Sequence, residues 1–173
     1  MATTTITTIR QATLSDVEQI AQVFAAGFID DDVFGRFMHP RRREYPLDWL
    51  AHWQREIRLH VLDPSVVTYA MAAFERNWED IKHHFVGARA QSWMIEMLCV
   101  APDAQGRGHG RALVEAAIAR CRGAEGGDGR VPLCVIASER GDAFYDKLGF
   151  REVGRANVGE LSGVSGGSLK QDA

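Results

Sequence analysis

Apolar positions recur at intervals of three and four residues in two segments near the N-terminus, the spacing of one helix face. The first stripe falls on Val17, Ile20, Ala21, Phe24 and Phe28. Ser15 and Glu18 have capping-box spacing, which predicts that this helix begins at Ser15. The second pattern begins near Pro46, stops at Asp63-Pro64, and has its stripe at Leu50, Trp53, Ile57 and Val61. We expect two amphipathic helices joined by a loop or short turn through Pro40.

Short apolar and β-branched runs predict the strands of a sheet. They fall at Ile6–Arg10, Ser65–Phe74, Trp93–Val100, Leu133–Ala137 and Arg151–Val153, with an edge strand at Ser168–Lys170. Between the second and third runs, a polar and aromatic stretch predicts a short helix over Trp78–Phe85. Two more helices follow, one with an apolar face that includes Leu113 and Val114, and one over Gly141–Leu148 closed by Gly149.

Composition places the chain among ordinary globular proteins. Its 173 residues, 46% hydrophobic and 25% charged, fit one domain over residues 1–173. No apolar run approaches the ~18 residues of a membrane span, and the N-terminus lacks the apolar core of a signal peptide, which predicts a cytoplasmic protein. The cysteines, Cys99, Cys121 and Cys134, are widely spaced and flanked by apolar residues. This pattern favours reduced, packed thiols over a disulfide framework or a metal site.

The net charge of −3 predicts no general attraction to nucleic acid or to an anionic membrane. An anionic ligand must therefore be held by a local feature, and the glycine-rich segment Gln105–Gly110 is the candidate. Glycines at alternate positions let backbone N–H groups point into one concavity, and a helix begins directly after them. A Walker loop is excluded because Arg111-Ala112 follows the segment, and the dinucleotide fingerprint spacing is absent.

The segment Gln105-Gly106-Arg107-Gly108-His109-Gly110 matches the pattern Gln/Arg-x-x-Gly-x-Gly/Ala, the pyrophosphate loop of the GNAT superfamily of N-acetyltransferases. Leu98–Pro102 before it resembles the end of that family's fourth strand, and Phe144–Phe150 resembles its second cofactor motif. The resemblance covers residues 93–153, and Phe28–Pro40 looks like a family substrate-wall segment. It implies an α/β fold with a mixed, mostly antiparallel sheet splayed between the fourth and fifth strands and flanked by about four helices. One departure is that a single convincing strand, Ser65–Phe74, replaces the usual hairpin before the fourth strand.

The resemblance also implies a binding site for acetyl-CoA as acyl donor, with no metal. The backbone of Leu98, Cys99 and Val100 would pair with the pantetheine arm. The pyrophosphate would bind the loop amides, with charge added by two arginine side chains; these positions are Gln105, Gly106, Arg107, Gly108, His109, Gly110 and Arg111. Ser138 lies where many relatives have an asparagine that touches the cofactor, and Gly141 lies where they often have alanine.

Two residues are candidates for the chemistry. Tyr145 matches the family tyrosine that protonates the leaving thiolate, a role that suits a phenol protonated at neutral pH. Glu96 lies inside the apolar run WMIEMLCV, where period-2 alternation places it on the same strand face as Met94 and Leu98. A carboxylate there would serve as the base that deprotonates an amine. His39, His83 and His84 are alternative bases.

The predicted function is therefore N-acetyl transfer from acetyl-CoA to the amine of a small molecule or peptide, by a monomer or homodimer. The acidic run Asp30–Asp32 favours a cationic acceptor if it borders the pocket, whereas Arg41-Arg42-Arg43 has the opposite charge, so the acceptor stays open. Two alternatives stay open as well: a non-catalytic acyl-CoA-binding or sensor domain, and an O-acyltransferase.

Overall fold

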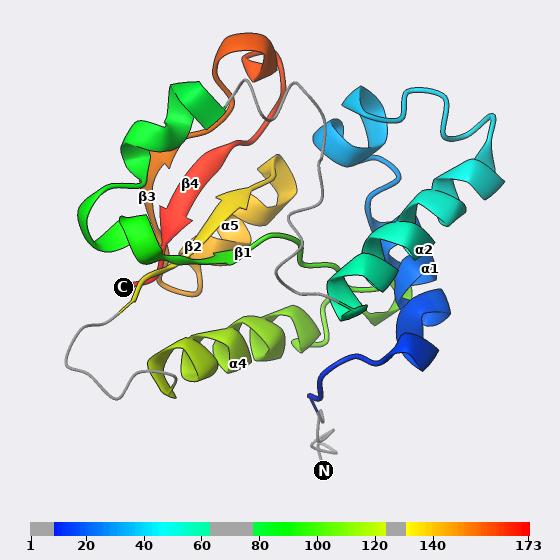
Figure 1. Cartoon of the computed structure of the whole chain (residues 1–173), viewed down its shortest axis with the longest axis horizontal. Helices are drawn as coiled ribbons and strands as arrows, with labels where there is room; N and C mark the ends of the chain where they lie inside the picture. The colour runs from blue at the N-terminus through cyan, green and yellow to red at the C-terminus, as the bar shows by residue number, and fades with distance from the viewer. Residues whose placement is uncertain (1–8, 63–77, 124–130) are drawn as a thin grey trace.

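The computed structural model describes residues 9–62, 78–123 and 131–173. The predicted strand at Ser65–Phe74 and most of that at Ile6–Arg10 lie outside these residues. Within them, a mixed sheet has the strand order β1-β2-β4-β3 (Figure 1). Strand β1 (Trp93–Ile95) is parallel to β2 (Leu133–Ala137), and β4 (Ser168–Gln171) is antiparallel to both β2 and β3 (Arg151–Arg155). The α/β fold with a mixed sheet is confirmed.

Two strand predictions need correction. Only the first three residues of the run Trp93–Val100 form a strand, because the chain leaves the sheet after Ile95. The segment Ser168–Lys170 is not an edge strand: β4 lies between β2 and β3 and contributes the buried residues Ser168, Leu169 and Lys170. A lysine and a serine in a short strand are typical of an exposed edge strand. In β4 both side chains are buried, because other elements of the fold supply polar partners for them.

The N-terminal helices pack against each other beside the sheet (Figure 1). Helix α1 (Val17–Gly27) follows a 3-10 turn, η1 (Leu14–Asp16), and α2 spans Pro46–Leu62. The predicted cap at Ser15 is wrong, because Thr13 is the N-cap residue and the Asp16 carboxylate accepts a hydrogen bond from the Thr13 backbone N–H at 2.8 Å. Helical structure therefore begins at Leu14, one residue before the predicted start.

An aromatic core joins the two N-terminal helices. The buried residues Ala21, Trp49 and Trp53 form its centre. Trp53 stacks on Phe28 with ring centroids 5.2 Å apart, and the Trp49 indole N–H donates to the Ala25 carbonyl at 2.9 Å. The predicted loop before Pro40 contains a π-helical segment, η2 (Asp32–Phe37). These contacts fix the segment after α1 against α2.

The second core lies between β2 and two later helices, α4 (His109–Gly123) and α5 (Glu139–Asp146). Alternate residues of β2 face it, and the cluster consists of Val114, Leu133, Val135, Ala137, Tyr145 and Phe150. Helix α5 begins two residues before the predicted start, and Gly149 ends the segment with φ +87°. The core therefore holds the helix that carries Tyr145 directly against the central strands.

Short helical turns connect these elements: η3 (Lys82–His84), η4 (Gly87–Gln91), η5 (Pro102–Ala104) and η6 (Gly159–Leu161). Residues 78–81 are helical and run into η3, as the prediction of a short helix over Trp78–Phe85 requires. Among the described helices, none is long and apolar enough to cross a membrane.

Candidate active site

A cavity of about 580 Å³ opens where β1 and β2 separate. Ile95 and Val135 are the last residues paired between the two strands. In Figure 1 the chain after β1 runs toward α1 and α2, while β2 continues along β4. The cavity lies between these diverging segments and is lined by Glu96, Met97 and Leu98 on one side, by Val135 to Ser138 on the other, and by Tyr145. This is the splayed geometry that the sequence resemblance implies.

Aromatic side chains from other elements complete the cavity wall. Phe28 and Phe34 come from the segment around η2, and Trp78 and Phe85, whose ring centroids are 5.0 Å apart, come from the segment before β1. The predicted substrate-wall segment Phe28–Pro40 therefore contributes two aromatic side chains to the wall.

The glycine loop has two residues in the left-handed region of backbone conformation. Gly106 and Gly108 have φ values of +74° and +87°, which L side chains rarely adopt. A Cβ added at either glycine would meet nothing within 4 Å, so the space beside the loop is open. Helix α4 starts at His109, so its first N–H groups and its positive dipole end adjoin the loop.

Gly110 differs from the other two glycines because it is packed. A Cβ at this position would lie 3.4 Å from the Phe144 ring and 3.6 Å from a Val100 methyl group. The start of α4 therefore sits close to α5 and to the end of the segment that follows β1. An added Cβ would make ordinary van der Waals contacts there, and no residue of the loop is among the described residues that line the cavity.

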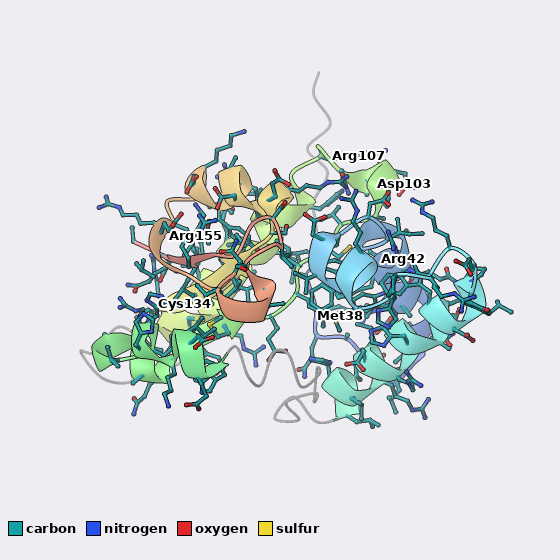
Figure 2. All side chains as sticks on the ribbon, turned by 90° about the horizontal axis from the view of Figure 1, so that it is seen from above. Met38, Arg42, Asp103, Arg107, Cys134 and Arg155 are labelled. Atoms are coloured by element: carbon teal, nitrogen blue, oxygen red, sulfur yellow. The ribbon has the colours of Figure 1, made fainter. Side chains whose placement is uncertain are left out.

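The polar side chains of the loop bond to the protein itself. Gln105 Nε2 donates to the Val100 carbonyl at 3.0 Å, and the Arg107 guanidinium donates to the Asp103 carbonyl at 2.7 Å. Figure 2 shows Arg107 and Asp103 together at one end of the molecule. Arg111 pairs with Glu115 at 3.3 Å, one helical turn away. These contacts favour the backbone amides, rather than the side chains, as the anion-binding groups of the loop.

Leu98, Cys99 and Val100 follow the divergence point, and their side chains point in different directions. Leu98 packs against the core of β2, α4 and α5, as Ile95 does. Met94, Glu96 and Leu98 all line the cavity, as the predicted alternation requires, but Ile95 and Met97 line it too. Strict alternation of the two faces therefore does not continue past the strand. Cys99 faces α1, where its thiol donates to the Val23 carbonyl at 3.4 Å, and burial raises the pKa of this thiol to about 11.

Ser138 is the N-cap of α5. Its hydroxyl oxygen accepts a hydrogen bond from the Gly141 N–H at 3.2 Å, and the residue also lines the cavity. A Cβ on Gly141 would lie 3.3 Å from the Ser138 oxygen and 3.4 Å from the Tyr145 ring. The two departures from the family pattern, Ser138 and Gly141, therefore meet at the start of the helix that carries Tyr145.

Tyr145 is buried, at 5% exposure, and packs between two phenylalanines. Its ring centroid lies 5.1 Å from that of Phe144 and 5.3 Å from that of Phe150. Burial raises the pKa of the phenol to about 12, so the hydroxyl is fully protonated at neutral pH. Tyr145 therefore lines the cavity with a packed side chain whose hydroxyl group is protonated.

Glu96 lines the same cavity and contacts a histidine that the sequence did not single out. Its Oε2 lies 3.0 Å from Nε2 of His60, in the last turn of α2. The two residues are 36 positions apart, and no spacing in the chain relates them. The pairing of a histidine in the last turn of a helix with a carboxylate just after a strand depends on the tertiary fold.

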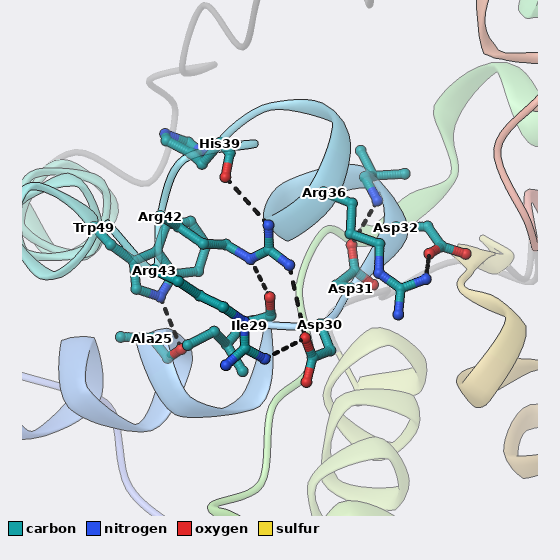
Figure 3. Close-up of polar contacts among 11 residues, drawn as sticks. Ala25, Ile29, Asp30, Asp31, Asp32, Arg36, His39, Arg42, Arg43 and Trp49 are labelled. Carbon is teal, nitrogen blue, oxygen red and sulfur yellow. Dashed lines mark hydrogen bonds and ion pairs between the residues drawn. The ribbon is translucent and has the colours of Figure 1, made fainter. Parts of the chain in front are cut away.

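Two of the three acidic residues Asp30–Asp32 form ion pairs with nearby arginines (Figure 3). Arg43 lies 2.7 Å and Arg42 3.6 Å from Asp30 Oδ1, and Arg36 lies 2.9 Å from Asp32. Asp31 instead caps η2: its Oδ1 accepts from the Val33 and Phe34 N–H groups at 2.9 and 2.8 Å. Asp31 also lines the cavity, and burial raises the pKa of its carboxyl group.

The three histidines considered as alternative bases lie elsewhere. His39 Nδ1 donates a hydrogen bond to the Phe34 carbonyl oxygen, 3.0 Å away, and its ring centroid lies 4.3 Å from that of His52. His83 and His84 contact each other in η3, at a centroid distance of 3.9 Å. None of the three is among the side chains that line the cavity in the described part of the chain.

The structure thus combines a mixed sheet that opens after a parallel strand pair with a glycine-rich loop at the start of the next helix. A sequence model of the acetyltransferase (GNAT) domain matches residues 61–152. The chain belongs to the GNAT acetyltransferase family and is an acyltransferase. No curated protein matches this sequence.

Proposed function

We propose that the protein transfers an acetyl group from acetyl-CoA to an amine by direct attack, with Glu96 as proton acceptor and Tyr145 as proton donor. The observation that carries this proposal is that both residues line one cavity at the point where β1 and β2 separate. A carboxylate and a phenol at one reaction centre supply the two proton transfers that the reaction needs.

The glycine loop fits the pyrophosphate of the donor. Two glycines in the left-handed region leave open space beside the loop, and α4 adds its N-terminal amides. An anionic group there gains hydrogen bonds and the favourable end of a helix dipole of 15 residues. The donor would be held by the amides of Gln105 to Arg111 and by the backbone of Leu98, Cys99 and Val100.

Direct attack is favoured over a covalent intermediate on cysteine. Cys99 lies within the proposed donor-binding segment, but its thiol donates a hydrogen bond to α1 and does not line the cavity. Because burial raises its pKa to about 11, this thiol stays protonated at neutral pH and supplies no thiolate nucleophile.

The raised pKa of Tyr145 suits a donor to a buried thiolate. A thiol that leaves in the same apolar surroundings also has its pKa raised by burial, as Cys99 shows. Burial therefore raises the pKa of the phenol and that of a buried thiol by a similar amount, so the two groups keep about the same difference in proton affinity as in water. Proton donation from Tyr145 stabilises the sulfur as the carbon–sulfur bond breaks.

The acceptor nitrogen must lose a proton, and Glu96 is placed to take it. Its side chain is 59% exposed, so protons exchange readily between the carboxylate and solvent. A panel of amines and alcohols, assayed by thiol release from acetyl-CoA and mass spectrometry of the products, tests the proposal. We expect acetylated amines. Acetylated alcohols alone would indicate an O-acyltransferase, and donor binding without transfer would indicate a sensor domain.

A further inference from the structure

His60 and Glu96 form a contact whose geometry fixes the number of protons between them. His60 Nδ1 lies 2.7 Å from the backbone carbonyl oxygen of Glu56, and Nε2 lies 3.0 Å from Glu96 Oε2. A carbonyl oxygen only accepts hydrogen bonds, so Nδ1 carries a hydrogen. An ionised carboxylate also only accepts, so a hydrogen must lie between Nε2 and Oε2. The pair therefore holds one shared proton when both contacts are made.

We propose that His60 is the positioning residue of Glu96: it holds one carboxylate oxygen by the shared proton and leaves the other oxygen for the acceptor amine. This inference rests on the proposed role of Glu96 as proton acceptor. The hydrogen bond to the Glu56 carbonyl orients the imidazole ring of His60, and the ring in turn holds Glu96 Oε2. In this arrangement the second oxygen, Oε1, remains for the cavity that Glu96 lines. A carboxylate on an otherwise exposed side chain thereby gains a single orientation.

The proton balance of one turnover follows from this arrangement. As the nitrogen–carbon bond forms and the carbon–sulfur bond breaks, Glu96 gains one proton from the nitrogen, and sulfur gains one from Tyr145. The His60–Glu96 pair then holds two protons, and Tyr145 lacks one. Exchange with solvent restores both, which the 25% exposure of the His60 side chain and the 59% exposure of Glu96 permit.

The charged groups around the pair determine how it responds to pH. Burial lowers the pKa of His60, while the Glu56 carbonyl, Glu96 and the Glu56 charge raise it, and the net shift is upward. Asp31 and Arg89 line the cavity that Glu96 shares. The positioning contact is therefore complete below the ordinary pKa of an imidazole and is lost as the pH rises through the raised pKa of His60, since neutral His60 turns a lone pair toward the carboxylate.

Nuclear magnetic resonance titration of the histidines tests the contact without requiring activity. The protein has six histidines, so the His60→Leu variant assigns the resonance of interest. We expect the pKa of His60 to fall in Glu96→Gln, because the neutral amide no longer stabilises the imidazolium. An unchanged His60 titration in Glu96→Gln would overturn the proposal, whether or not the protein acetylates any amine.

Kinetics with a saturating amine then test the positioning role. His60→Leu should lower kcat by about 10- to 100-fold with little change in the affinity for acetyl-CoA. His60→Gln keeps a neutral N–H donor near the position of Nε2, so it should restore most of kcat and remove the fall in rate at high pH. Arg58→Gln, an exposed position on the same helix, is the matched control.

The outcomes separate the two hypotheses. If the wild-type protein binds acetyl-CoA but acetylates no amine, the proposed function fails. If the wild-type protein is active and His60→Leu matches Arg58→Gln in kcat and pH profile, the positioning role of His60 is wrong and the proposed function stands.

Discussion

The Lys170 ammonium group, on the central strand β4, lies 2.5 Å from Asp146 Oδ1 on α5. The side chain of Lys170 is only 3% exposed, and Asp142 of the same helix lies 3.2 Å away. Tyr145 stands between the two aspartates in sequence and is buried against the neighbouring strand β2. Lys170 therefore attaches the helix that carries the proposed proton donor to the middle of the sheet.

Replacing this lysine should loosen α5. We expect Lys170→Met to lower the free energy of unfolding by about 1.5–3 kcal/mol, the range for hydrogen bonds to charged groups, as measured by urea denaturation. Lys147→Met, at an exposed position after α5, is the control and should leave stability nearly unchanged.

The effect should also depend on pH in a defined direction. The Ser168 hydroxyl and Lys170 lower the pKa of Asp142, so its contribution is present above the ordinary carboxyl pKa and is lost as the pH falls through the lowered value. The stability difference between wild type and Lys170→Met should therefore shrink in acid. A difference that grows toward low pH would contradict the contact as described.

Gly108 tests anion binding by the glycine loop. Gly108→Val faces no neighbouring atom within 4 Å, but it places a branched side chain at φ +87° and in the open space beside the loop. We expect the variant to fold and to lose most of its affinity for acetyl-CoA in calorimetric titration. Gly163→Val, also in open space but without a positive φ, should bind like the wild type. Equal affinity of the two variants would place the pyrophosphate elsewhere.

Tyr145→Phe keeps the packed ring and removes the proposed proton donor. Since the ring contacts with Phe144 and Phe150 remain, donor binding and stability should stay close to wild type. We expect the turnover number to fall by about 10²–10⁴-fold, the usual contribution of a general acid. Tyr45→Phe, at an exposed tyrosine before α2, is the control. A turnover number equal to that of the control would leave Tyr145 as a packing residue.

Glu96→Gln preserves the shape of the side chain and removes its ability to take a proton. The affinity for acetyl-CoA should be retained, and the acidic limb of the pH–rate profile should disappear with a large loss of kcat. Steady-state kinetics across the pH range provide the measurement. Wild-type rates with an unaltered profile would show that another group, or the amine's own ionisation, accounts for that limb.

Much of the fold could be predicted because local patterns and packing agree. The run Leu133–Ala137 is apolar throughout and becomes β2 with the same bounds, since it is paired on both sides within the sheet and packs against α4 and α5. Pro46 and the apolar stripe after it give α2 from Pro46 to Leu62. The glycine spacing at Gly106 and Gly108 becomes a loop with two positive φ values.

The rest depends on contacts between distant segments. Lys170 can be buried because Asp142 and Asp146 of α5 pair with its ammonium group. From the strand sequence alone, a lysine indicates an exposed position, so the central place of β4 could not be predicted. Ile95 and Met97 line the cavity beside Glu96 because the chain leaves β2 after Ile95, so strand alternation alone does not determine which side chains face the cavity. The partnership with His60 joins residues 36 positions apart, which no local pattern encodes.

The most direct test of the account is thiol release from acetyl-CoA, measured with and without an amine acceptor for the wild type and for the double variant Glu96→Gln/Tyr145→Phe. If Glu96 and Tyr145 carry the two proton transfers, the wild type should release thiol in an amine-dependent manner. The double variant should do so at a rate lower by at least about 10²-fold, with its affinity for acetyl-CoA unchanged. Equal amine-dependent rates in the two proteins, or none in a wild type that binds acetyl-CoA, would contradict the account.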